Sequence, residues 1–193
     1  MSAGSASSTR RKEGVARPDG RPLDKVRALQ WTLYRYAKQE PERRFHALYG
    51  HVHRMDVLWR AWSGVCTNRG APGVDGVTID VVAAAGVEEF LQDLAERLRT
   101  GIYRPAPLRR VKIPKPGRPG ESRPLSIPTV ADRVVMTAAK LVIEPVFEAD
   151  FLPVSYGFRP KRSAIDACEK VRTEANRGRE WLLRPTSETV RDD

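Results

Sequence analysis

The chain has 193 residues, with 34 Lys and Arg against 24 Asp and Glu, so its formal net charge is +10. Hydrophobic residues make up 40% and charged residues 30%, a balance that excludes a wholly disordered or fibrous protein. Cys66 and Cys168 belong to no CxxC or His/Cys cluster, and no apolar run approaches the roughly 20 residues that span a bilayer. We therefore expect a cytoplasmic protein without membrane association, whose positive charge favours nucleic acid as a partner.

The first 63 residues contain two kinds of sequence. Residues 1–22 are Ser, Gly, Arg and Pro with few apolar side chains, which predicts a disordered basic tail. From residue 23 to residue 63 apolar residues recur every three or four positions, which predicts two helices broken near Pro41. Three tryptophans at helical spacing are expected in the core rather than as stacking platforms: Trp31, Trp59 and Trp62.

A loop rich in Gly, Pro and Asn follows at residues 68–76. Its glycines permit positive φ angles and tight turns. Residues 87–98 then carry apolar side chains at helical spacing, which predicts an amphipathic helix closed by Gly101.

The next segment alternates with a period of two. Residues 109–114 and 123–128 flank a stretch rich in Gly and Pro, which predicts a β-hairpin with a basic tip. Between Arg104 and Arg123 there are seven basic residues and one acid, Glu121. The alternation is expected to place Arg and Lys on one face, where they can meet successive phosphates or a nucleotide triphosphate. Because exposed basic strands also prevent edge-to-edge pairing, charge alone leaves that alternative open.

Two capping boxes indicate where later helices begin. Thr129 to Asp132 opens a long helix that we expect to end or kink at Pro145, and Ser163 to Asp166 opens another. Residues 155–160 lie between them as a loop, and residues 181–183 suggest the start of a strand.

Five blocks of this sequence, in order, make the function more specific. They are Asn68–Gly76, Tyr103–Lys115, Arg123–Arg133, Glu144–Glu148 and Ser155–Pro160. Together they resemble the N-terminal half of a bacterial group II intron reverse transcriptase, or maturase. The resemblance covers residues 23–183 and implies an α+β fold: N-terminal helices, the fingers hairpin and the beginning of the palm of a right-hand polymerase. It implies RNA-directed DNA synthesis with Mg²⁺ and deoxynucleoside triphosphates, and binding of intron RNA, template RNA and a DNA target.

The resemblance also assigns roles to residues. Lys115 and Arg123 match the fingers residues that contact the incoming triphosphate. The residues expected along the template or intron RNA are Arg104, Arg109, Arg110, Lys112, Arg133, Tyr156, Phe158, Arg159, Lys161 and Arg162. The last five mix cations with aromatic rings, as contact with an RNA backbone and its bases requires.

The catalytic carboxylates of that family are missing from this sequence. Polymerases hold two divalent metals with carboxylates, and the family supplies them from an Asp on the strand after the last matched helix and from a Tyr-X-Asp-Asp turn. Here residues 184–193 match nothing expected and no Tyr-X-Asp-Asp occurs. A one-nucleotide deletion near Leu183 would explain this ending. We therefore expect a truncated reverse transcriptase with no catalytic or metal-binding residue, or alternatively a non-catalytic basic RNA-binding module.

Overall fold

The computed structural model describes residues 24–118 and 120–178. The predicted tails at residues 1–22 and 184–193, and the strand suggested at residues 181–183, lie outside these residues. The chain divides into two compact units, Met1–Asp150 and Phe151–Asp193, which are described separately. The described residues are mostly helical with one two-stranded sheet, which fits the expected α+β class.

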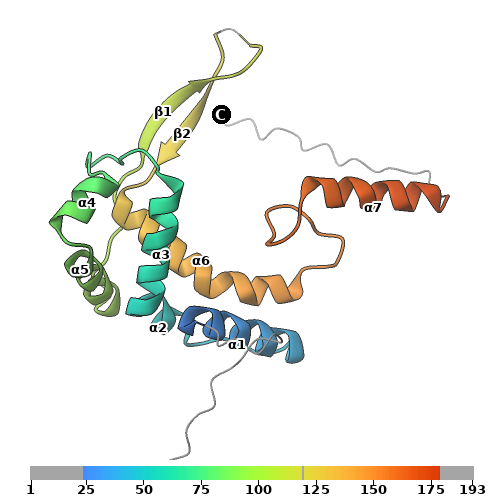
Figure 1. Ribbon diagram of the computed structural model, residues 1–193, viewed down its shortest axis with the longest axis horizontal. Helices are drawn as coiled ribbons and strands as arrows, with labels where there is room; N and C mark the ends of the chain where they lie inside the picture. The colour runs from blue at the N-terminus through green and yellow to red at the C-terminus, as the bar shows by residue number, and fades with distance from the viewer. Residues whose placement is uncertain (1–23, 119, 179–193) are drawn as a thin grey trace, which may run out of the picture. The chain divides into compact units, whose positions relative to one another are not determined.

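The first unit is built mainly from helices (Figure 1). Their bounds are α1 Lys25–Gln39, α2 Leu48–Val52, α3 Met55–Asn68, α4 Ile79–Ala85, α5 Val87–Arg99 and α6 Val130–Asp150. Helix α6 is central and packs against α1, α2 and α3, while α5 packs against α3 and α4. The core contains side chains from all six helices, among them the fully buried Leu58, Leu91 and Val134.

The tryptophan prediction is correct for one residue of three. Trp62 is buried and packs edge-on against Phe90. Trp31 and Trp59, by contrast, are 48% and 42% exposed, so placing them in the core was wrong. Helical spacing sets the direction of a side chain on its own helix, but contacts with other parts of the chain decide whether it is covered.

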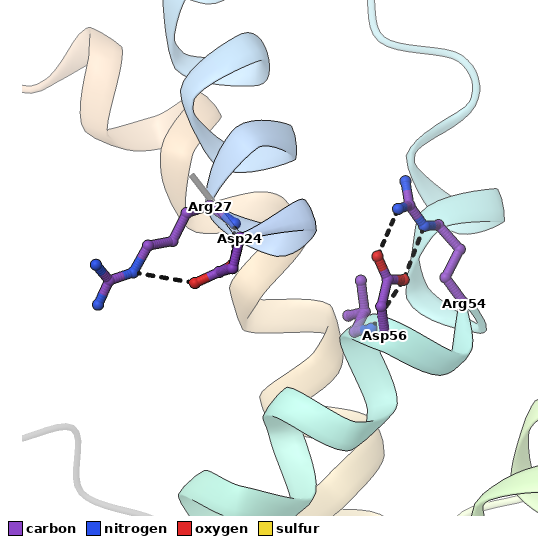
Figure 2. Close-up of polar contacts among 5 residues, drawn as sticks. Asp24, Arg27, Arg54 and Asp56 are labelled. Atoms are coloured by element: carbon purple, nitrogen blue, oxygen red, sulfur yellow. Dashed lines mark hydrogen bonds and ion pairs between the residues drawn. The ribbon is translucent and has the colours of Figure 1, made fainter. Parts of the chain in front are cut away.

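The break predicted near Pro41 is present, but the following segment forms two helices instead of one. Helix α2 ends at Val52, and Arg54 adopts an extended conformation before α3. The Arg54 guanidinium binds both carboxylate oxygens of Asp56, at 3.0 and 2.6 Å (Figure 2). Asp56 lies in the first turn of α3, where a carboxylate also interacts favourably with the helix dipole. This local pair favours a new helix start at Met55.

Side-chain caps fix the starts of α1 and α4. Asp24 accepts a hydrogen bond from the Arg27 amide at the start of α1 and forms an ion pair with its guanidinium (Figure 2). Thr78 accepts one from Val81 at the start of α4, a short helix that the sequence analysis missed. Gly101 has a φ angle of +72° just after α5, as predicted for the residue that closes that helix.

Helix α6 continues through Pro145 to Asp150, so of the two expected effects, an end or a kink, an end at Pro145 is wrong. Proline has no N–H, so the Leu141 carbonyl one turn earlier lacks its normal donor. The Gln30 side chain of α1 supplies that donor, with Nε2 3.0 Å from the Leu141 oxygen. Lys38 Nζ also donates to the Ala149 carbonyl at the end of α6, at 3.0 Å. Helix α1 therefore satisfies the backbone groups that Pro145 and the helix end leave open.

We expect Gln30→Ala to lower the free energy of unfolding by about 1–2 kcal/mol, because it leaves the part-buried Leu141 carbonyl without a donor. In a Pro145→Ala background the same change should cost about 0.5 kcal/mol or less, since the backbone amide of the introduced alanine restores the helical bond. Urea unfolding of the four proteins in this cycle measures both costs. An equal cost in the two backgrounds would contradict the role given to Gln30.

The sheet is the predicted β-hairpin. Strand β1, Arg109–Pro114, pairs antiparallel with β2, Ser122–Ile127, and the register joins Arg109 to Ile127 and Pro114 to Ser122. Figure 1 shows the hairpin extending away from the helices of the first unit.

Over its described residues, 151–178, the second unit contains a loop and helix α7, Ala164–Asn176. Both halves of the predicted capping box are present, because Ser163 Oγ accepts from the Asp166 amide and the Asp166 carboxylate accepts from the Ser163 amide.

Candidate nucleic-acid interface

The register of the hairpin gives it two different faces, because directly paired residues point to the same side of a sheet. The side called here the polar face carries Arg110, Lys112, Pro114, Ser122, Pro124 and Ser126. The opposite side, the apolar face, carries Arg109, Val111, Ile113, Arg123, Leu125 and Ile127. The basic side chains are thus divided between two faces, and the expectation that one face holds them all was wrong.

The polar face presents two cations two residues apart. Arg110 and Lys112 are exposed, and neither side chain has a hydrogen-bond or ion-pair partner among the residues that the structure describes. Their Cα atoms are separated by about 6.8 Å, because an antiparallel strand rises about 3.4 Å per residue. Small Ser and Pro side chains surround them, so a polyanion can approach both charges.

The cations at the hairpin tip are arranged around an acid. Lys115 Nζ lies 2.8 Å and Arg118 Nη1 3.5 Å from the same oxygen of Glu121. The Lys115 amide donates to the Glu121 carbonyl, so the two residues lie opposite each other just beyond the strands. By alternation Arg123 points to the same side as Glu121. The two residues expected at a triphosphate, Lys115 and Arg123, therefore share one side of the tip, with Glu121 beside them.

Two of the predicted RNA-binding arginines hold the loop at residues 68–76 instead of standing free. Arg109 Nη1 donates to the Pro72 carbonyl at 3.2 Å, and Arg133 Nη2 donates to the Ala71 carbonyl at 2.9 Å. These bonds join the base of the hairpin, the loop and the start of α6. Arg104 likewise donates to the carbonyls of Gly101 and Tyr103.

Gly73 allows this loop to approach α6 closely. A Cβ at residue 73 would lie 2.7 Å from the backbone N and Cα of Thr129, a distance that real Cβ atoms do not adopt. Glycine is needed at residue 73 because there is no room for a Cβ. Gly76 in the same loop has a φ angle of +69°, the positive value that the sequence predicts.

We expect Gly73→Ala to lower the free energy of unfolding by about 1–3 kcal/mol, because the loop must move away from Thr129. The matched control is Gly50→Ala in α2, where a Cβ would meet nothing within 4 Å. There the change should be neutral or stabilising by up to about 1 kcal/mol, because alanine loses less conformational entropy. Equal destabilisation of the two variants in thermal unfolding would contradict this account of Gly73.

A buried carboxylate fixes the segment that leads into the hairpin. Asp132 is 6% exposed and accepts hydrogen bonds from the Tyr103 hydroxyl, the Thr129 hydroxyl at 2.6 Å and the Ala106 amide at 3.3 Å. Burial raises the pKa of Tyr103, and its bond to Asp132 raises it further. Thr129 Oγ1 in turn accepts from the Asp132 amide, as the predicted capping box requires.

The loop of the second unit uses its arginines internally. Arg159 Nη1 donates to the carbonyls of Leu152 and Ser155, and Arg162 Nη1 donates to that of Pro153. Arg162 also lies over the Tyr156 ring, at 5.1 Å from its centroid. Phe158 is fully exposed, and Lys161 next to this network is exposed too. RNA binding by these five residues stays a prediction.

Within residues 24–118 and 120–178, no three His, Cys, Asp or Glu side chains are placed to hold a metal ion. No helix in the same ranges is long and apolar enough to cross a membrane.

Comparisons with known proteins connect this chain to a family. No family model matches the chain. Protein YkfC of Escherichia coli (strain K12) is 37% identical over 165 residues, which cover 82% of this chain and 42% of YkfC. The group II intron-encoded protein LtrA of Lactococcus lactis subsp. cremoris is 33% identical over 139 residues, covering 72% of this chain and 22% of LtrA. The chain belongs to the family of group II intron-encoded proteins.

The similarity extends to yeast intron proteins. A putative COX1/OXI3 intron 1 protein of Saccharomyces cerevisiae is 29% identical over 134 residues, covering 68% of this chain and 15% of that protein. The chain thus spans less than half the length of these relatives.

Proposed function

We propose that this chain is the fingers region and the beginning of the palm of a group II intron reverse transcriptase, or maturase, and that its hairpin binds RNA. The observation that carries the proposal is the exposed pair Arg110 and Lys112, on a hairpin extending from a member of this family. Arg–phosphate and Lys–phosphate contacts position nucleic acid without reading its sequence. The RNA in this proposal is the group II intron or the copied template. Binding of a DNA target is assigned to the complete enzyme of this family.

In this proposal the complete enzyme of this family also carries out polymerisation, with Mg²⁺ as its cofactor and deoxynucleoside triphosphates as its substrates. The described residues do not fit a Mg²⁺ site, since they contain no cluster of three carboxylate, His or Cys ligands. The sequence has no Tyr-X-Asp-Asp segment either. In this proposal the chain by itself binds RNA and does not carry out polymerisation.

The test is binding of a fluorescent single-stranded RNA of about 20 nucleotides to the full chain, measured by anisotropy between about 50 and 300 mM KCl. Each phosphate neutralised contributes about −0.7 to the slope of log K against log salt. Three or four hairpin cations therefore predict a slope of about −2 to −3. Absence of binding at the lowest salt concentration, or an affinity independent of salt, would overturn the proposal.

A further inference from the structure

Glu121 is an acid in a segment that is otherwise basic. It is the single carboxylate between Arg104 and Arg123, among seven Lys and Arg residues. One of its oxygens accepts from both Lys115 and Arg118, at 2.8 and 3.5 Å. The Lys115 ammonium beside it lowers the pKa of Glu121, so this carboxylate is ionised at neutral pH.

The backbone holds the acid in this position. The Lys115 amide donates to the Glu121 carbonyl at 3.0 Å, and the Glu121 amide donates to the Arg118 carbonyl at 3.2 Å. The carboxylate thus meets the two cations inside a closed turn. Its side chain and that of Lys115 are about half exposed, so an anion from solution can reach the same ammonium.

We propose that Glu121 is an internal competitor for the hairpin tip: it occupies Lys115 in the free chain, and a bound phosphate has to displace it. This inference rests on the proposed RNA binding by the hairpin. A small anion with one charge gains little binding free energy by replacing the Glu121 carboxylate at Lys115. A polyanion that also contacts Arg123, which shares this side of the tip, gains enough to do so. Glu121 thereby favours RNA over small anions and lowers the affinity of the tip.

The test compares Glu121→Gln with the unchanged chain in the same RNA-binding measurement. Because exposed ion pairs are weak, freeing Lys115 should tighten RNA binding by about two- to fivefold at the lowest salt concentration. The salt slope should become steeper by about 0.7, which corresponds to one added phosphate contact.

The matched control is Glu96→Gln in α5. Glu96 also forms an exposed ion pair, 2.7 Å from Arg99, and its loss changes the net charge by the same amount away from the hairpin. We expect less than about a 1.5-fold change in RNA affinity for this control. An equal gain for both variants would overturn the proposal, because the effect would then be one of net charge.

A double-mutant cycle supplies a second condition. In a Lys115→Ala background Glu121→Gln should lose most of its gain in affinity, since the ammonium it would free is absent. An undiminished gain would overturn the role given to Lys115. If the unchanged chain binds no RNA, the proposed function itself fails. If it binds and Glu121→Gln binds no more tightly, this inference alone fails.

Discussion

Replacing Asp132 by alanine is expected to lower the free energy of unfolding by about 3–5 kcal/mol. The carboxylate accepts bonds from the Tyr103 and Thr129 hydroxyls and the Ala106 amide, and alanine would leave these donors without an acceptor in a buried site. The segment before β1 would then lose its attachment to α6. Urea unfolding followed by circular dichroism measures the loss.

Two further variants keep this prediction testable if Asp132→Ala does not fold. Asp132→Asn keeps the shape and part of the acceptor capacity, so its cost should be about 1–3 kcal/mol. Asp93→Ala is the control, because Asp93 is an exposed helix residue with a 3.4 Å ion pair to Arg97, and its loss should cost about 0.5 kcal/mol or less. Equal costs for Asp132→Asn and Asp93→Ala would contradict a central role for Asp132.

Removing both cations of the polar face is expected to weaken RNA binding by roughly 10- to 50-fold at about 100 mM KCl. The variant is Arg110→Ala with Lys112→Ala. It removes two phosphate contacts, each of which contributes about 0.7 to the magnitude of the salt slope, so the slope should become shallower by about 1.4. Anisotropy titrations at several salt concentrations give both quantities.

The control for this variant removes the same charge from the helices. Arg60→Ala with Lys140→Ala also deletes one Arg and one Lys, both exposed and both outside the hairpin. Its affinity should fall less than about threefold, through long-range electrostatics alone. A loss as large as that of the hairpin variant would mean that RNA binds without preference for the polar face.

Local sequence signals predicted several parts of this fold correctly. The hairpin strands, the capping boxes at Thr129 and Ser163 and the turn at Gly101 all appear where the sequence places them. In each case the signal that predicted the feature lies within a few neighbouring residues of the sequence. Alternation, a cap hydrogen bond or a positive φ angle can therefore be recognised without knowing the tertiary structure.

The wrong predictions depend on contacts between distant residues. Helix α6 passes through Pro145, and Gln30, 111 positions from Leu141, donates to the carbonyl that Pro145 leaves without a donor. Arg109 donates to the Pro72 carbonyl, 37 positions away, so it holds a loop instead of being available to RNA. Nothing in the local pattern indicates either partner.

The sequence identified which basic residues belong to the hairpin, but it did not show where their side chains lie or what they contact. Alternation located the hairpin and charge counting marked it as basic, but neither signal showed which of its Arg and Lys side chains are engaged by other residues. The structure distinguishes Arg110 and Lys112, which are exposed, from Arg109 and Arg133, which hold a loop. Glu121 was visible in the sequence as the single acid of the segment, but its bonds to Lys115 and Arg118 required the folded tip.

The most direct test of RNA binding by the hairpin is to map where RNA lies on the chain. Ultraviolet crosslinking of a 4-thiouridine-labelled single-stranded RNA to the full chain, followed by mass spectrometry of the peptides, gives this map. We predict that the dominant crosslinks fall between Arg104 and Ile127 and disappear in the Arg110→Ala, Lys112→Ala variant. Dominant crosslinks on the helices of the first unit, unchanged in that variant, would contradict the account.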